Sequence, residues 1–342
     1  MKKFKKRIFP VLILIISVFA AFYRKSPVKV FADEKYYYIS GEVFGFSLIS
    51  EGITVIGLSD VVTNEKTYSP AKDAGIKPDD VITKINENKL KSDSDIDKYI
   101  KSGYNELEII SGGKTKNILV KPAKDINGNL RLGIFIRGDI CGIGTVSYYD
   151  SDGRFSALGH EIYDKEYAKT PIIGGALKEA GITKIIKGTK GIPGEIQGYI
   201  KSADTGTIEY GISTGIYGEK KNFDKSAYQK IAAARRGEAK IGKATAISNI
   251  SGSTESYDIK IVKVTEEKKE KNLVIKVNDE KLLSLTGGIV QGMSGSPIVQ
   301  NGRLVGAVTH VFISDPAHGY GIFAQSMYEH LLSLSETEEQ AA

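Results

Sequence analysis

Ser294 lies in the segment GMSGSP, residues 292–297, where a serine is framed by two glycines. A serine hydroxyl attacks a carbonyl only when a base takes its proton, and the oxyanion that forms needs nearby N–H donors. Gly292 and Gly295 allow the positive φ angles of a tight turn, which would aim the amides of Gly292, Met293 and Ser294 at one point. The segment indicates a nucleophile turn with an oxyanion hole, or alternatively a Gly/Ser-rich β-turn between strands.

Only four histidines could supply the base, and two of them, His160 and His310, lie in strand-like segments. His160 precedes Ser294 in the chain, which is the order of the chymotrypsin-like arrangement, in which two barrels contribute to one cleft. We therefore favour His160 as the general base. His310 ends the strand-like run after the serine, where it and Thr309 could line a substrate cleft or serve the packing alone.

The acid that would orient the histidine is harder to choose, because a carboxylate can reach it from many places in a fold. Asp279 follows the apolar run 273–275, at a strand end from which it could extend. The residues alone leave the choice open. The other candidates between His160 and Ser294 are Asp164, Asp204, Asp224 and Asp258.

The segment 286–320, TGGIVQGMSGSPIVQNGRLVGAVTHVFISDPAHGY, resembles the signature of the stage IV B sporulation serine protease family. The family's Ala-Leu-Gly-His element is matched by residues 157–160. The resemblance implies a chymotrypsin-clan serine endopeptidase with a PDZ domain ahead of the protease. It also implies a triad of His160, Ser294 and Asp279, the last in the family's Lys-x-x-Asp context.

Members of this family are signalling proteases of endospore formation, so the resemblance implies a narrow substrate range. They leave the forespore for the space between its two membranes, cleave themselves, and cut a membrane-bound inhibitor of an intramembrane metalloprotease that activates a sigma factor. The expected partners are therefore that protein substrate and a PDZ peptide ligand, which could be another copy of the chain. The alternative is an exported PDZ scaffold of weak catalytic power that sequesters a partner.

We expect a PDZ domain over residues 34–124, because residues 69–86 show its short helix, closing glycine and following strand. Residues 39–58 predict a hairpin of short strands. The segment FGFSL within them resembles a carboxylate-binding loop, in which backbone amides hold a peptide C-terminus while the peptide adds a strand. A turn in a spacer without a groove is the alternative. The candidate peptide-binding residues are Gly45, Phe46, Ser47 and Leu48.

The protease domain should cover residues 125–334 as a mainly β, chymotrypsin-like double barrel, since short β-prone runs alternate with Gly, Lys and Thr clusters. We expect a helix over residues 228–236, a C-terminal helix from 325 to 334, and a flexible acidic tail at 335–342. The clearest strand-like runs are 207–212, 256–264 and 272–277.

Residues 1–32 read as a signal peptide or membrane anchor, with a basic start followed by sixteen uncharged, mainly apolar residues at 8–23. This segment carries eight basic residues and no acid, so its loss would change the formal charge from +6 by −8 to −2. The basic pI is thus no argument for nucleic-acid binding. A single cysteine, Cys141, excludes an internal disulfide, and we expect it to be buried. No motif predicts a metal or cofactor.

Overall fold

The structure, a computed structural model of the chain, describes residues 34–162, 172–266 and 271–331. The predicted leader, residues 1–32, and the predicted tail, residues 335–342, lie outside the described residues. None of the helices in the described ranges combines the length and the apolar character that a membrane crossing requires.

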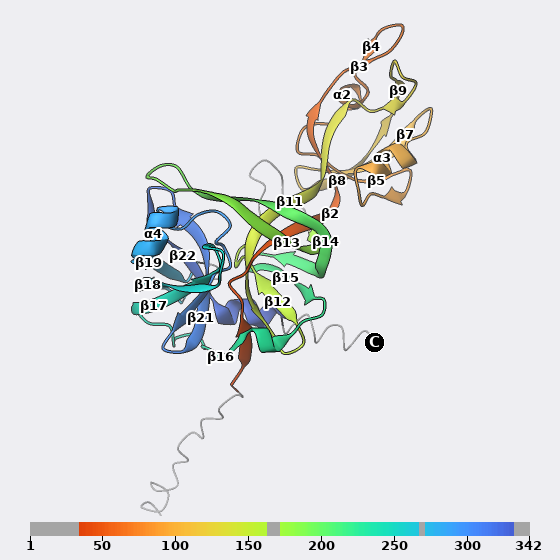
Figure 1. Cartoon of the computed structure of the whole chain (residues 1–342). Coiled ribbons are helices and arrows are strands. Elements are labelled where there is room, and N and C mark those ends of the chain that lie inside the picture. The colour runs from red at the N-terminus through yellow and green to blue at the C-terminus, as the bar shows by residue number, and fades with distance from the viewer. Residues whose placement is uncertain (1–33, 163–171, 267–270, 332–342) are drawn as a thin grey trace, which may run out of the picture. The chain divides into compact units, whose positions relative to one another are not determined.

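The first half of the protease region forms a closed ring of six antiparallel strands. Each strand pairs with two others in the ring, so the sheet closes on itself as a barrel (Figure 1). Its core includes Phe44, Phe155 and Leu177. In ring order the strands are β2 (Val43–Leu58), β11 (Ile134–Tyr149), β12 (Arg154–Ala157), β15 (Gly215–Lys220), β14 (Glu195–Ile212) and β13 (Ile172–Ile186).

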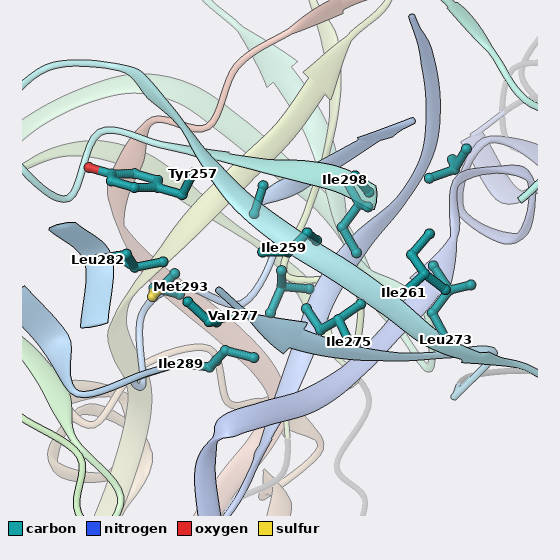
Figure 2. Close-up of a cluster of buried hydrophobic side chains, with 14 of the residues drawn as sticks. Tyr257, Ile259, Ile261, Leu273, Ile275, Val277, Leu282, Ile289, Met293 and Ile298 are labelled. Atoms are coloured by element: carbon teal, nitrogen blue, oxygen red, sulfur yellow. The ribbon is translucent and has the colours of Figure 1, made fainter. Parts of the chain in front are cut away.

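A second ring of six antiparallel strands follows in the chain. Alternate residues of one of its strands, Tyr257, Ile259 and Ile261, turn inward, as the twofold side-chain period of a strand requires. Figure 2 shows these side chains packed with Ile275 and Ile298. In ring order the strands are β17 (Gly242–Ser248), β18 (Glu255–Val264), β19 (Leu273–Val277), β22 (Asp315–Phe323), β21 (Arg303–Phe312) and β20 (Pro297–Gln300).

Two further strands connect the rings. β1 (Tyr36–Ile39) pairs with β11 and with β16 (Gln229–Ala233), and β16 runs parallel to β21. The helix predicted over residues 228–236 is therefore wrong, because both edges of this segment are taken up by strand pairing. The predicted C-terminal helix is confirmed within the described chain: residues 324–331 are helical and bury Met327 against the core between the rings.

The residues from the second part of β2 to the first part of β11 form a lobe with its own apolar core. This core includes Ile53, Ile82 and Leu107. The predicted short helix with its closing glycine is present, since Gly75 has φ +81° after α2. The lobe's elements are β3 (Val61–Val62), β4 (Thr67–Tyr68), α2 (Pro70–Asp73), β5 (Val81–Ile85), β6 (Asn88–Lys89), α3 (Ser94–Tyr99), β7 (Asn105–Ser111), β8 (Lys114–Val120), β9 (Ala123–Lys124) and β10 (Leu130–Arg131).

The structure differs from the sequence prediction at the start of this lobe. Residues 34–52 were expected in a PDZ domain with a hairpin, yet 43–58 form one long strand whose first part belongs to the first barrel. The predicted peptide-binding residues Gly45, Phe46, Ser47 and Leu48 pair with β11 on one edge and with β13 on the other, so their amides cannot hold a peptide. Cys141, opposite Ser47 in β11, is exposed rather than buried.

Candidate active site

The turn around Ser294 depends on close backbone packing between the two barrels. Gly292 and Gly295 have φ +99° and +100°, where side chains other than hydrogen are disfavoured. A Cβ on Gly295 would lie 1.9 Å from the carbonyl oxygen of Thr145, a residue of β11. Thr145 also donates from its N–H to the Ser294 carbonyl and from Oγ1 to the Gly292 carbonyl. The first barrel thereby fixes the orientation of the serine turn.

Two backbone N–H groups of this turn are available for an oxyanion. Within the described ranges, the amides of Gly292 and Ser294 make no hydrogen bond. The predicted third donor, Met293, is unsuitable, because its N–H already donates to the Val290 carbonyl at 3.1 Å. The Gly295 amide is likewise used, by the Val308 carbonyl. The oxyanion hole thus has two donors rather than the three expected from the sequence.

His160 follows a strained turn at the end of β12. Leu158 has φ +68°, which is unusual for a branched side chain, and Gly159 has φ +70°. The imidazole Nδ1 lies 2.7 Å from the Glu161 carbonyl oxygen. Because a carbonyl oxygen can only accept, Nδ1 carries the proton and Nε2 keeps a lone pair. This is the tautomer that a general base for a serine requires.

Ser294 and His160 contact two neighbouring residues of β21, Thr309 and His310. Ser294 Oγ donates to the Thr309 carbonyl at 2.6 Å. The centre of the His310 ring lies 4.5 Å from the centre of the His160 ring. A Cβ on Gly159 would lie 3.1 Å from Thr309 Cγ2. The serine hydroxyl points to the carbonyl rather than to imidazole, and such catalytic contacts often form only when substrate binds.

The sequence around this site matches a known peptidase family. The model of the SpoIVB peptidase S55 family matches residues 128–328, which contain His160, Ser294 and every strand of the two barrels except β2. The chain belongs to the SpoIVB peptidase S55 family. The protein is therefore a serine peptidase.

Two solved structures are also similar to this chain. The inactive Ser343Ala mutant of Rv3671c from M. tuberculosis H37Rv shares 13% identity, with a TM-score of 0.31, over 57% of this chain and 82% of that one. The inactive form of the Rv3671c protease shares 14% identity, with a TM-score of 0.29, over 56% and 83% of the two chains. No curated protein matches the sequence.

Asp279 has a structural role in the described geometry. It is the N-cap of α4 (Glu280–Thr286), and its carboxylate accepts from the amides of Leu282 at 2.8 Å and Asp258 at 3.2 Å. Among the described residues, no carboxylate hydrogen-bonds to His160. The assignment of Asp279 as the triad acid, which rests on the family motif, stays a prediction.

The other candidate acids also have roles or positions of their own. Asp204 pairs with Lys178, and Asp224 caps the short 3-10 helix η1 (Lys225–Ala227). Asp164 lies outside the described residues. No group of three or more potential metal ligands occurs in the described ranges.

Sequence reasoning missed two contributors to the site, the Glu161 carbonyl and Thr145. The carbonyl acts through the backbone, so its residue type carries no signal. Thr145 lies in an ordinary strand-like run, and only the pairing of the barrels reveals its contacts with the serine turn.

The capping role of Asp279 predicts a moderate effect on stability. Asp279→Ala should lower the free energy of unfolding by about 1 kcal/mol, whereas Asp279→Asn should keep it, because both Asp and Asn cap helices well. Denaturant unfolding of the two variants measures this. Equal losses in both would show that the cap contributes little. A collapse of peptidase activity in the Asn variant at unchanged stability would assign the carboxylate to catalysis.

The burial of His160 predicts where activity falls at low pH. Burial lowers the pKa of His160 below its ordinary value of 6.5, and the charge of Lys271 acts in the same direction, while the bond to Glu161 opposes them. Since the base must be neutral, kcat/KM should persist below pH 6.5 and fall only when His160 is protonated. A pH profile of kcat/KM with its acidic limb above 6.5 would contradict this environment.

Proposed function

We propose that this SpoIVB peptidase is an exported regulatory serine endopeptidase that cleaves itself and a specific membrane-associated regulatory protein during endospore formation. One observation supports the peptidase chemistry: a bond to the Glu161 carbonyl orients His160, while the amides of Gly292 and Ser294 donate to no group in the described residues. The narrow substrate and the link to sigma-factor activation are supported by the family resemblance of residues 286–320. The proposed place of action is the intermembrane space of the forespore.

In the proposed reaction, His160 Nε2 takes the proton of Ser294 Oγ as the oxygen attacks the peptide carbonyl. The amides of Gly292 and Ser294 donate to the oxyanion. The imidazolium is stabilised through Nδ1–H by the Glu161 carbonyl, and it then protonates the leaving amine. Water, activated by the same imidazole, releases the acyl group from Ser294.

We propose that the lobe binds a protein segment of the substrate or of another copy of the chain. Because residues 45–48 are covered, the peptide site is proposed at a cavity of about 540 Å³. Its lining includes α3 residues Ser94 and Ile96 and the strand residues Ile134 and Ile136. That strand segment pairs with β2 on one edge, and within the described residues no strand covers its other edge. An added peptide strand fits such an edge.

Self-cleavage by the full-length protein tests the proposal. The purified chain is incubated with and without prior treatment with a fluorophosphonate, a reagent that phosphonylates nucleophilic serines with loss of fluoride, and fragments are identified by mass spectrometry. We expect fragments only from the untreated protein. Fragments in both samples would mean contamination by another protease. Labelled but uncleaved protein would refute self-cleavage, and an unlabelled, intact chain would favour the PDZ scaffold alternative.

A further inference from the structure

His310 lies beside the catalytic residues, and the proposed reaction does not use its imidazole. It follows Thr309, whose carbonyl accepts from Ser294, and its ring packs beside that of His160. Its Nδ1 is buried and has no hydrogen-bond partner within the described residues. A buried N–H without an acceptor is rarer and costlier than a buried lone pair, so the proton belongs on Nε2. The ring therefore offers an N–H donor.

The imidazole of His310 stays neutral while it does so. Burial, together with the neighbouring His160 and the charge of Lys271, lowers the pKa of His310 to about 4. A second positive ring beside His160 would oppose formation of the His160 imidazolium during acylation. A neutral donor has no such cost.

Lys271 supplies a positive charge to the part of the second barrel that contains His310. It is exposed, and its Nζ lies 5.0 Å from the centre of the Tyr320 ring. The Tyr320 ring in turn packs 4.6 Å from that of Phe312, two residues beyond His310 on β21. The charge of Lys271 lowers the pKa of both His160 and His310. None of the ion pairs within the ranges that the structure describes involves Lys271.

We propose that His310 and Lys271 form a substrate subsite for an acidic side chain, aspartate or glutamate, near the scissile bond. A neutral N–H from His310 and an ammonium from Lys271 together suit a carboxylate and leave a basic side chain less well bound. This inference rests on the proposed peptidase function and names the substrate class that the cleft selects.

The expected discrimination follows from the strength of such contacts. A hydrogen bond to a charged group contributes enough for a preference of about 10- to 100-fold in kcat/KM. Replacing Glu by Gln at the recognised position of the substrate should therefore lower kcat/KM by about 10- to 100-fold. The preference should weaken at high salt, because Lys271 is exposed and its charge is screened.

A positional peptide library cleaved by the full-length protein tests this subsite. Products of the wild type, Lys271→Glu and His310→Ala are compared by mass spectrometry, with Lys260→Gln as a control for loss of an exposed lysine elsewhere on the barrel. We expect the wild type and the control to prefer Asp or Glu at one position beside the cleaved bond. Lys271→Glu should change that preference to Lys or Arg, and His310→Ala should reduce it.

Labelling of Ser294 by a fluorophosphonate is measured on the same samples, since the reagent carries no peptide side chain. Labelling without any acid preference in the wild type, or an acid preference that survives in Lys271→Glu, would overturn the subsite. A wild type that is not labelled at Ser294 would instead overturn the proposed peptidase function.

Discussion

Ser294→Ala should lower kcat on a peptide substrate by a factor on the order of 10⁶, as loss of a nucleophile does in a serine peptidase. The variant should still fold, because within the described residues Ser294 Oγ makes one hydrogen bond, to the Thr309 carbonyl, and the substitution leaves Gly292 and Gly295 of the turn in place. Substrate affinity should be retained, since the oxyanion amides and the cleft remain. The measurement is kcat and KM on one peptide, together with a thermal unfolding curve.

Ser296→Ala is the matched control for this change. Ser296 lies two residues away in the same turn, and its Oγ is buried without a partner in the described chain. Removing an unsatisfied buried hydroxyl should leave stability unchanged or slightly raised, and peptidase activity intact. Equal inactivation of both variants would mean that the turn, rather than the Ser294 hydroxyl, is what the substitution disrupts.

Gly295→Ala should destabilise the protein by about 3 kcal/mol or more, combining the cost of a positive φ with that of overpacking. The added methyl would lie 1.9 Å from the Thr145 carbonyl oxygen and 2.7 Å from the Leu158 nitrogen. Both contacts are backbone atoms of the first barrel, so neither can move aside by a rotamer change. The serine turn should separate from Thr145, and activity should be lost with stability.

Gly302→Ala separates the two causes of that loss. Gly302 also has a positive φ, +73°, but an added Cβ would meet no atom within 4 Å. We expect a loss of about 1 kcal/mol from backbone strain alone. Denaturant unfolding of both variants measures the difference. Similar losses in the two would show that the barrels do not pack as tightly at Gly295 as the structure indicates.

Much of the catalytic site could be predicted because its signals are local. The serine turn depends on Gly292 and Gly295, and glycine is the residue type that adopts positive φ values most readily. The apolar alternation of residues 256–264 marks a barrel strand that the structure confirms as β18. The oxyanion amides, however, depend on which N–H groups other carbonyls already occupy. Met293 was misassigned for that reason.

The errors in the fold come from segments whose neighbours are distant in the sequence. Gly52 has φ +91°, which is typical of a hairpin turn, yet β2 continues through it. At this point β2 passes so close to β5 that a Cβ on Gly52 would lie 2.7 Å from the Ile82 carbonyl oxygen. Gly45 similarly admits Ile200 from β14, at 2.6 Å from an added Cβ. Residues 228–236 have helix-forming composition, yet pairing with β1 and β21 outweighs that weak preference.

Covalent labelling shows whether Ser294 is a nucleophile that His160 activates. The full-length wild type and His160→Ala are treated with a fluorophosphonate, and the rate at which the peptide containing Ser294 gains the label is followed by mass spectrometry. We expect labelling of the wild type at Ser294 alone, and a rate lower by a factor on the order of 10⁴ or more when the base is missing. Labelling at the same rate in both proteins, or none at Ser294 in the wild type, would contradict this expectation.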